Sequence, residues 1–339
     1  MFYENLKTKK ILICGGAGYI GSHLVRELST QSAYEIIIFD NLSKGHIKSI
    51  PNGIKFENAD VRDKRALDRL FSKYKPDAVM NFCGSISLRE SVVDPLEYYE
   101  NNVVGTIYLL QAMKKHNVKY FIFSSSAAIF GNAKEMPITD DARPEPISPY
   151  ADTKFIIEKI LAWSENAYGL KYVCLRYFNA CGAHESGDIG EDHDPETHLI
   201  PLTLQVALGQ RDSISVFGDD YDTKDGTCVR DYIHVTDLAT AHIRALEYLI
   251  RENKSQLFNL GSGEGYTVRE VINAARNVTG HSIPDIVEAR RIGDPAILIA
   301  ESTRAELILG WKRKYNTIES IVASAWMYHK THTNGFKDI

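Results

Sequence analysis

A glycine-rich turn directly after the first apolar run is the feature that most constrains the fold. The run Ile11–Cys14 is followed by Gly15, Gly18 and Gly21, with Gly16 giving a second, nested G-x-G-x-x-G pattern. Glycine permits a positive φ at a strand-to-helix turn, and its missing side chain lets backbone N–H groups and a helix N-terminus approach a phosphate. The position predicts the first βα unit of a dinucleotide-binding sheet, although the pattern alone also fits an ordinary tight turn.

Short apolar runs rich in β-branched residues alternate with amphipathic stretches of helical length. The runs lie at Ile11–Cys14, Glu35–Phe39, Ile54–Glu57, Ala78–Phe82, Tyr120–Ser124 and Tyr172–Arg176. This rhythm predicts βαβ units and a doubly wound parallel sheet with right-handed crossovers.

The rhythm breaks after about Phe178, where a Gly-, Asp-, Glu- and His-rich segment begins. Helical patterns recur at Leu199–Gly209, Val235–Ile250, Thr267–Thr279 and Ile318–His329. We therefore expect an α/β protein with a Rossmann-type NAD-binding domain at 1–177 and a smaller α/β substrate-binding domain at 178–339. An interleaved boundary is expected.

Composition excludes several classes of function. The 339-residue chain has a formal net charge of -5, so it lacks the basic field that nucleic-acid binding requires. The first apolar run is too short for a signal sequence, and none reaches membrane-spanning length. Five widely spaced cysteines without a C-x-x-C pair indicate reduced thiols. We expect a cytoplasmic protein that binds neither nucleic acid nor membrane.

Asp40 ends the second predicted strand, nineteen residues after Gly21. A carboxylate there can bind the adenosine ribose hydroxyls and would repel a 2′-phosphate, which favours NAD over NADP. An aspartate that only starts a loop is the alternative.

Tyr150 and Lys154 form Y-x-x-x-K at a predicted helix start that Pro149 favours. The i,i+4 spacing places phenol and ammonium on one helical face. A free phenol has a pKa of about 10, but a nearby ammonium and the positive nicotinamide ring would stabilise the phenolate. Ser126 follows a predicted strand at the sheet edge where such folds bind ligands. A solvated helix face and a polar strand exit are the alternatives without chemistry.

These segments resemble the UDP-glucose 4-epimerases of the extended short-chain dehydrogenase/reductase family. The resemblance runs almost the full length of the chain, and its second-half motifs are more specific than the glycine turn. The matching words include GGAGYIGSH, DNLSKGH, FSSSAA, SPYADTK, LRYFNACGAH, GEDHDPETHLIP, FGDDYDTKDGTCVRDYIHV and RRIGDPA.

The resemblance implies NAD as cofactor and a UDP-hexose as substrate. Tyr150 would take the proton of the sugar 4-hydroxyl as hydride leaves C4, Ser126 would bind the same oxygen, and Lys154 would hold the nicotinamide ribose. The 4-keto sugar would rotate within the pocket and receive the hydride on its other face. UDP-glucose and UDP-galactose would interconvert in this way, as in galactose metabolism.

The implied cofactor residues are Gly15, Gly18, Tyr19, Ile20, Gly21, Asp40, Asn41, Leu42, Ser43, Lys44, Gly45, Asp60, Val61, Phe82, Cys83, Gly84, Ser85, Ile86, Asn101, Tyr150, Lys154 and Phe178. The implied substrate residues are Ser126, Tyr150, Phe178, Asn179, His198, Leu199, Ser215, Val216, Phe217, Arg230, Arg291, Asp294 and Leu298. Arginine suits a diphosphate because guanidinium offers forked donors, although salt bridges with Asp231 or Asp294 are the alternative. A homodimer formed by helices around Pro95–His116 and Pro149–Tyr168 is also implied.

Three positions depart from the family pattern. Phe130 replaces a frequent tyrosine, and Ile86 stands where some relatives carry a cofactor-facing lysine. Leu298 replaces the bulky tyrosine of epimerases restricted to unsubstituted hexoses. The smaller leucine predicts that UDP-N-acetylglucosamine and UDP-N-acetylgalactosamine are also accepted.

The sequence is also compatible with three different functions on the same fold. A dehydratase or decarboxylase would share the 4-keto intermediate, but a 4,6-dehydratase needs an acid/base carboxylate pair where this chain has Ala127 and Ala128. A dehydrogenase that releases NADH is the second possibility, and a non-enzymatic NAD-binding scaffold is the third.

The segment from His184 to His198 holds three histidines and several carboxylates. Their spacing matches no zinc template, so we expect no metal and a solvated loop.

Overall fold

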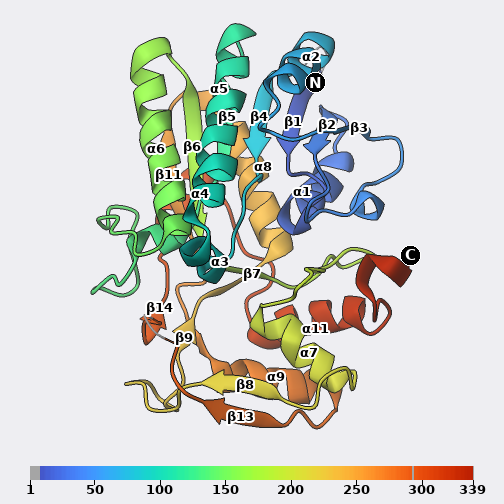
Figure 1. Ribbon diagram of the computed structural model, residues 1–339, viewed down its shortest axis with the longest axis vertical. Coiled ribbons are helices and arrows are strands. Elements are labelled where there is room, and N and C mark those ends of the chain that lie inside the picture. Colours follow the sequence, from blue (N-terminus) through green and yellow to red (C-terminus); the bar gives the residue numbers. More distant parts are fainter. Residues whose placement is uncertain (1–7, 292–293, 339) are drawn as a thin grey trace. The chain divides into compact units, whose positions relative to one another are not determined.

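The computed structural model describes residues 8–291 and 294–338. Over these residues the central feature is a seven-stranded sheet in the order β11-β6-β5-β4-β1-β2-β3 (Figure 1). Its pairings from β6 to β3 are parallel. The predicted Rossmann-type α/β fold is thereby confirmed, with the strand order reversing between β1 and β4.

The strands and the helices that connect them have the following bounds. The strands are β1 (Lys9–Cys14), β2 (Tyr34–Asp40), β3 (Lys55–Asn58), β4 (Ala78–Asn81), β5 (Tyr120–Ser124), β6 (Lys171–Tyr177) and β11 (Gln256–Leu260). The helices are α1 (Tyr19–Ser29), η1 (Ile47–Ser49), α2 (Lys64–Tyr74), α3 (Leu88–Val93), α4 (Pro95–Tyr98), the π-helical η2 (Tyr99–Val104), α5 (Gly105–Lys115), η3 (Ala127–Phe130), α6 (Pro149–Tyr168) and α8 (Val235–Glu252).

Both faces of this sheet are buried. Leu12 and Cys14 of β1 pack with apolar side chains of α2, α5 and α6 on one face. Ile11 and Ile13, which point the other way, are also fully buried. The central strands β1, β4 and β5 are therefore largely apolar, as parallel strands covered by helices on both sides must be, whereas the edge strand β3 is polar and only partly buried.

The described chain forms two compact units by its internal contacts. Among the described residues, 8–131, 143–176 and 239–258 form the first, and 132–142, 177–238, 259–291 and 294–338 form the second. The domain division at 177/178 stays a prediction. Residues 1–7 and 339, and Ile292 and Gly293 of the RRIGDPA motif, lie outside the described residues.

The second unit combines short strands with helices around its own apolar core. That core includes side chains of α7, α9 and α11. The elements are β7 (Asn179–Cys181), α7 (Leu199–Ala207), β8 (Ile214–Phe217), β9 (Val229–Arg230), β10 (Tyr232–His234), β12 (Tyr266–Thr267), α9 (Val268–Thr279), β13 (Asp285–Glu288), β14 (Ile297–Leu298), α10 (Thr303–Leu309), α11 (Ile318–His329) and η4 (Gly335–Asp338).

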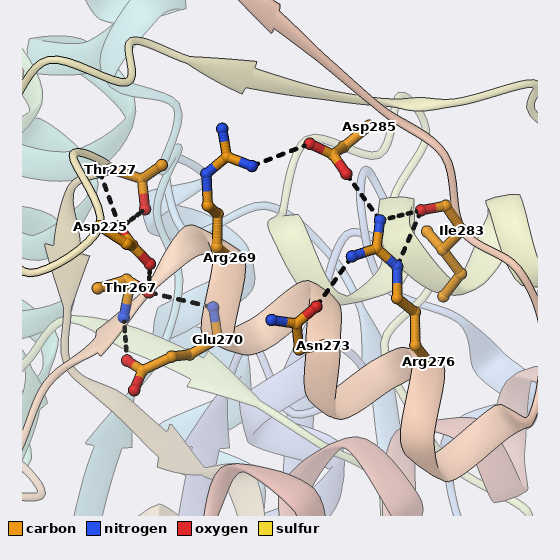
Figure 2. A network of polar contacts seen from close by, with 9 residues as sticks. All are labelled: Asp225, Thr227, Thr267, Arg269, Glu270, Asn273, Arg276, Ile283 and Asp285. Atoms are coloured by element: carbon orange, nitrogen blue, oxygen red, sulfur yellow. Dashed lines mark hydrogen bonds and ion pairs between the residues drawn. The ribbon is translucent and has the colours of Figure 1, made fainter.

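Helix α9 is fixed at its N-terminus by a capping box. The Thr267 hydroxyl accepts the Glu270 N–H at 3.1 Å, and the Glu270 carboxylate accepts the Thr267 N–H at 2.8 Å. Thr267 also donates to Asp225 (Figure 2). Toward its C-terminus Arg276 pairs with Asp285 at 2.7 Å, which ties α9 to β13.

None of the described helices is both long enough and apolar enough to cross a membrane.

Candidate active site

The predicted glycine turn lies at the carboxyl end of β1, beside the point where the strand order reverses. Gly15 has φ +79°, and a Cβ there would lie 2.8 Å from the Cys83 nitrogen after β4. A Cβ at Gly45 would lie 2.8 Å from the Ala17 carbonyl carbon. Chain segments that follow β1, β2 and β4 therefore meet backbone to backbone, which only glycine permits at these two positions.

Asp40 ends β2 and is buried. Its Oδ2 accepts the Ala17 N–H at 2.9 Å and its Oδ1 accepts the Leu42 N–H at 2.8 Å. The carboxylate thus holds the glycine turn in place, a role that the sequence did not indicate. Carboxylate oxygens retain further lone pairs, so the predicted ribose contact stays compatible with this arrangement.

Asp60, a predicted adenine contact, lies in a polar cluster after β3. It pairs with Arg62 at 2.9 Å and accepts the Asn41 amide at 2.9 Å. The hydrogen bond from Arg62 lowers the pKa of Asp60 to about 2. The neighbouring Val61 is buried in the core, so its backbone is the part that can meet a ligand.

The turn after β4 is held by Asn102, a buried residue that the sequence reasoning missed. Its Oδ1 accepts the Ser85 N–H at 2.8 Å, and its Nδ2 donates to the Ser85 carbonyl at 3.0 Å and to Thr153 Oγ1 at 3.1 Å. The predicted Asn101 donates to Ser85 Oγ at 2.9 Å. Ile86 beside them is exposed. The two adjacent asparagines in ENNVVGT are the sequence signal from which the role of Asn102 could have been predicted.

Tyr150 and Lys154 lie on one buried face at the start of α6. Ser148 caps the helix by accepting the Ala151 N–H at 3.2 Å, and Pro149 occupies the first turn. The Lys154 ammonium donates to the Ser124 carbonyl at 2.9 Å and lies 5.9 Å from the centre of the Tyr150 ring. The structure thus brings these two predicted residues together.

Burial dominates the electrostatics of this pair. It raises the pKa of Tyr150, and a hydrogen bond with the Ser126 hydroxyl opposes that rise. Burial lowers the pKa of Lys154 to about 8. The Ser126 Oγ also accepts the Ala128 N–H at 3.1 Å, which fixes Ser126 at the start of η3. All three predicted catalytic side chains are therefore buried and near one another.

Glu158 and Arg176 form a buried charged network that contacts Ser125, the neighbour of Ser126, and that the sequence did not predict. Glu158 accepts the Ser125 hydroxyl at 2.6 Å and the Arg176 guanidinium at 2.7 Å. The guanidinium lies 5.3 Å from the centre of the Phe130 ring. Phe130, expected from the family resemblance to be a tyrosine in many relatives, thus packs against a cation.

The residues of the first unit fit a dinucleotide. Gly18 offers no side chain to cap α1, and the first turn of α1 has no acidic residue. The positive end of the helix dipole and its first N–H groups therefore suit a pyrophosphate. Asp40 follows on the adjacent strand, as the recognition of NAD requires.

In the second unit, Arg230 and Leu298 are direct partners where β9 pairs with β14. Arg230 pairs with Asp294 at 2.6 Å, which is the salt bridge expected if this arginine has a structural role. Arg291 lies 3.8 Å from the centre of the Phe217 ring and is exposed. A cavity of about 510 Å³ is lined by residues of this unit that include Asp294 and Ile297.

The remaining predicted substrate residues of this unit differ in exposure. Val216 is fully buried in the core, and Ser215 donates to Glu288 at 2.6 Å. Phe178 is partly buried, and Asn179 donates to the Asp231 carbonyl at 2.8 Å.

Asp231, not predicted as a site residue, is buried beside these positions. Its carboxylate accepts the Ser262 N–H at 2.8 Å and the Ala300 N–H at 3.0 Å, and burial raises its pKa to about 6.

His198 and Leu199 lie at the start of α7, next to an unpredicted cluster of imidazoles and carboxylates. His198 contacts Glu191, and His193 lies 3.2 Å from the same carboxylate. Ile189, Gly190 and Glu191 are buried, so the expectation of a solvated loop was wrong for this stretch.

A glycine turn that fits a dinucleotide at the reversal point of a doubly wound sheet, beside a buried tyrosine–lysine pair, is typical of redox-active nucleotide-binding enzymes. The chain matches the family described as NAD dependent epimerase/dehydratase over residues 11–261. The chain therefore belongs to this NAD-dependent family.

Comparison with individual proteins narrows the similarity to UDP-glucose 4-epimerases. The chain is 52% identical over 326 residues to a UDP-glucose 4-epimerase from Halalkalibacterium halodurans, covering 96% of this chain and 97% of the relative. It is 40% identical to the UDP-glucose 4-epimerase from Bifidobacterium longum solved in complex with NAD+ and UDP, with a TM-score of 0.90 and coverage of 97% and 100%. A UDP-Glc/GlcNAc 4-epimerase from Campylobacter jejuni is also 40% identical, with a TM-score of 0.84 and coverage of 95% and 99%.

Proposed function

We propose that the protein is an NAD-dependent isomerase that inverts C4 of UDP-glucose and UDP-galactose. The observation that carries this proposal is the buried Tyr150–Lys154 pair at the start of α6, with the Ser126 hydroxyl opposing the rise that burial causes in the pKa of Tyr150. The relatives named above support the choice of a UDP-hexose over different substrates.

Tyr150 is the proton shuttle of this proposal. NAD, when bound, supplies a ring that accepts hydride from C4 and returns it. Tyr150 takes the proton of the 4-hydroxyl in the first half of the reaction and returns it to the same oxygen in the second. Ser126 holds that oxygen, and Lys154, anchored on the Ser124 carbonyl, binds the nicotinamide ribose.

The cofactor and substrate residues implied by the resemblance are proposed for the same roles here. In the first unit, the glycine turn and the start of α1 bind the pyrophosphate, and Asp40 binds the adenosine ribose. In the second unit, Arg230 and Arg291 bind the diphosphate of the substrate with their forked donors. Binding would then require Arg230 to share or exchange its contact with Asp294.

We also propose that UDP-N-acetylhexosamines are accepted. Leu298 has a shorter and narrower side chain than tyrosine and is only partly buried in β14. Space beside this residue would accommodate an N-acetyl group on C2. The relative from Campylobacter jejuni, whose name includes both sugars, supports this extension.

A homodimer is proposed through the helices at 95–116 and 149–168. Within these ranges α4 contacts α6, and the two helices expose Leu96 and Trp163. The preceding helix α3, which also contacts α6, adds the exposed Val92 and Val93. Trp163 is 73% exposed, which is unusual for tryptophan on a monomer and typical of an interface.

A cytoplasmic location is proposed as well. All five cysteines are free thiols, and four of them are buried. Reduced thiols of this kind are typical of a reducing compartment. Cell fractionation with an antibody to the protein tests this location, and recovery outside the cytoplasmic fraction would contradict it.

The central experiment is conversion without added cofactor. Purified protein incubated with UDP-galactose should produce UDP-glucose with no external NAD, because an epimerase returns its cofactor to the starting state in each turnover. Accumulation of NADH with a keto sugar would indicate a dehydrogenase. Loss of water from the sugar, seen by mass spectrometry, would indicate a dehydratase.

A further inference from the structure

We propose that Glu191, His193, Glu196 and His198 form a zinc site at the start of α7. Each residue offers one ligand atom, and the four atoms lie within 4.8 Å of one another. Imidazole nitrogens and carboxylate oxygens are ligands that Zn²⁺ prefers in proteins. The proposal does not depend on the epimerase activity.

The distances between these atoms fit a single ion. Four ligands at tetrahedral bond lengths of about 2.0–2.2 Å stand roughly 3.4 Å apart. The His193 Nδ1 lies 3.2 Å from Glu191 Oε1 and 3.7 Å from Glu196 Oε2. The His198 Nδ1 lies 3.5 Å from Glu196 Oε1. The direct contact between His198 and Glu191 has to open to admit the ion.

The charges and burial of the cluster also suit a divalent cation. The side chains of Glu191 and Glu196 are only 3% and 7% exposed, so two carboxylates are largely removed from water. One Zn²⁺ would compensate both charges. Two protonated imidazoles would do the same, which makes an ion-pair network without metal the competing explanation.

A small cavity borders this cluster. Its volume is about 40 Å³, and its lining includes Glu191 and His198. Because a single water needs only about 10–15 Å³ by this kind of measure, the cavity has room for water beside a bound ion. The sequence led us to expect no metal here, because the spacing of the histidines and carboxylates matches no zinc template.

The site would fix the long segment between β7 and α7. Three of its ligands precede α7, and His198 is the N-cap residue of that helix. Coordination through Nδ1 leaves the His198 Nε2 as a donor for another group. A bound ion would therefore order the residues that begin α7, including His198 and Leu199.

Metal content tests the proposal directly. The protein is produced without a polyhistidine tag in zinc-supplemented medium, dialysed against metal-free buffer and analysed by mass spectrometry for metals. We expect about one zinc per chain, as for a four-ligand structural site. Chelation should lower the melting temperature, and Co²⁺ added afterwards should give the visible absorption of a tetrahedral site.

Matched variants separate this site from adventitious zinc. His193→Gln and Glu196→Gln should each lose zinc, whereas His184→Gln, a half-buried histidine of the same segment, should retain it. Circular dichroism checks that the variants fold. Wild-type protein that binds no Zn²⁺ in direct titration, or variants that retain it fully, would overturn the proposal and leave the ion-pair network.

Discussion

At the scale of single residues, the proposed chemistry depends on groups whose protonation the fold has changed. Burial disfavours the charged form of both Tyr150 and Lys154, so the pKa of the phenol rises and that of the ammonium falls to about 8. The Ser126 hydroxyl is the group that stabilises the phenolate. Bound NAD, whose nicotinamide ring is positively charged, would add to that stabilisation. Tyr150 would therefore act as a base only when NAD is bound.

Replacing Tyr150 by phenylalanine removes the proton shuttle while keeping the ring. We expect Tyr150→Phe to lose on the order of 10²- to 10⁴-fold in the rate of UDP-galactose conversion, with little change in stability. Tyr168→Phe, at the other end of α6, is the control and should retain the rate. Equal rates for both variants would remove Tyr150 from the mechanism.

The lowered pKa of Lys154 predicts a pH dependence of stability in NAD-free protein. The folded pKa is about 8 against an ordinary value of 10.5, so the unfolded chain binds the proton more tightly. Lys154 therefore contributes stability above pH 10.5 that is lost as the pH falls through 8, by about 3 kcal/mol.

The difference between wild type and Lys154→Met in urea unfolding at pH 7 and pH 9.5 measures this contribution. We expect the wild type to gain stability relative to the variant as the pH rises. Lys159→Met, an exposed lysine of the same helix, is the control and should show no such trend. A difference that is constant with pH would contradict the lowered pKa.

Leu298 controls the proposed acceptance of N-acetylated sugars. We expect Leu298→Tyr to lower kcat/KM for UDP-N-acetylgalactosamine by roughly tenfold or more, which is the size of effect that a poorly fitting substrate group has on kcat/KM. The kcat/KM for UDP-galactose should stay unchanged. Leu298→Ala should keep both substrates. Wild-type protein without turnover of either UDP-N-acetylhexosamine would refute the extended range.

At the scale of elements, the sequence patterns with strong local causes were confirmed. The predicted helix at Thr267–Thr279 matches α9, because its N-cap, its acidic first turn and its terminal glycine are all local signals. The six predicted strands overlap β1 to β6, because the apolar and β-branched residues that indicate most of these strands are a local signal; the edge strand β3 is the most polar of them.

Features that depend on distant contacts were missed. In η2 a π-helical turn directs both Asn101 and Asn102 to Ser85, although neighbouring residues of an α-helix point in different directions. No local pattern indicated that β11 joins the sheet beside β6. The contacts of Asp40 with Ala17 belong to the same class, because they join segments that only the folded chain brings together.

The capping box of α9 gives a prediction at this scale. Thr267→Ala removes the hydrogen bonds to the Glu270 N–H and to Asp225 (Figure 2). We expect a loss of about 1–2 kcal/mol in the free energy of unfolding, measured by urea denaturation. Thr279→Ala at the other end of α9 is the control and should cost less. A loss no larger than that of the control would show that the cap does not stabilise the protein.

At the scale of the whole molecule, the first unit holds the proposed chemistry and the second holds several proposed substrate contacts. The apolar side chains on α3, α4 and α6 belong to the first unit, as do Tyr150 and Lys154. Because α6 carries both the exposed Trp163 and the proposed catalytic pair, association of two chains would also stabilise the helix that bears the chemistry.

Trp163→Glu tests the proposed homodimer. A charge at this position should convert the dimer into a 38.1 kDa monomer in light scattering. Ile286→Glu, an exposed apolar residue on β13, is the control and should leave the dimer intact. A wild-type protein that is monomeric at micromolar concentration would contradict the proposal.

The interleaved order of the two units has a consequence for how the chain is made. Residues 239–258 belong to the first unit, although 177–238 belong to the second. A growing chain released from the ribosome as far as residue 177 therefore lacks part of its nucleotide-binding unit. That unit becomes complete only after about three quarters of the protein has been synthesised. Folding intermediates formed earlier therefore expose the part of the first unit that residues 239–258 cover in the folded protein.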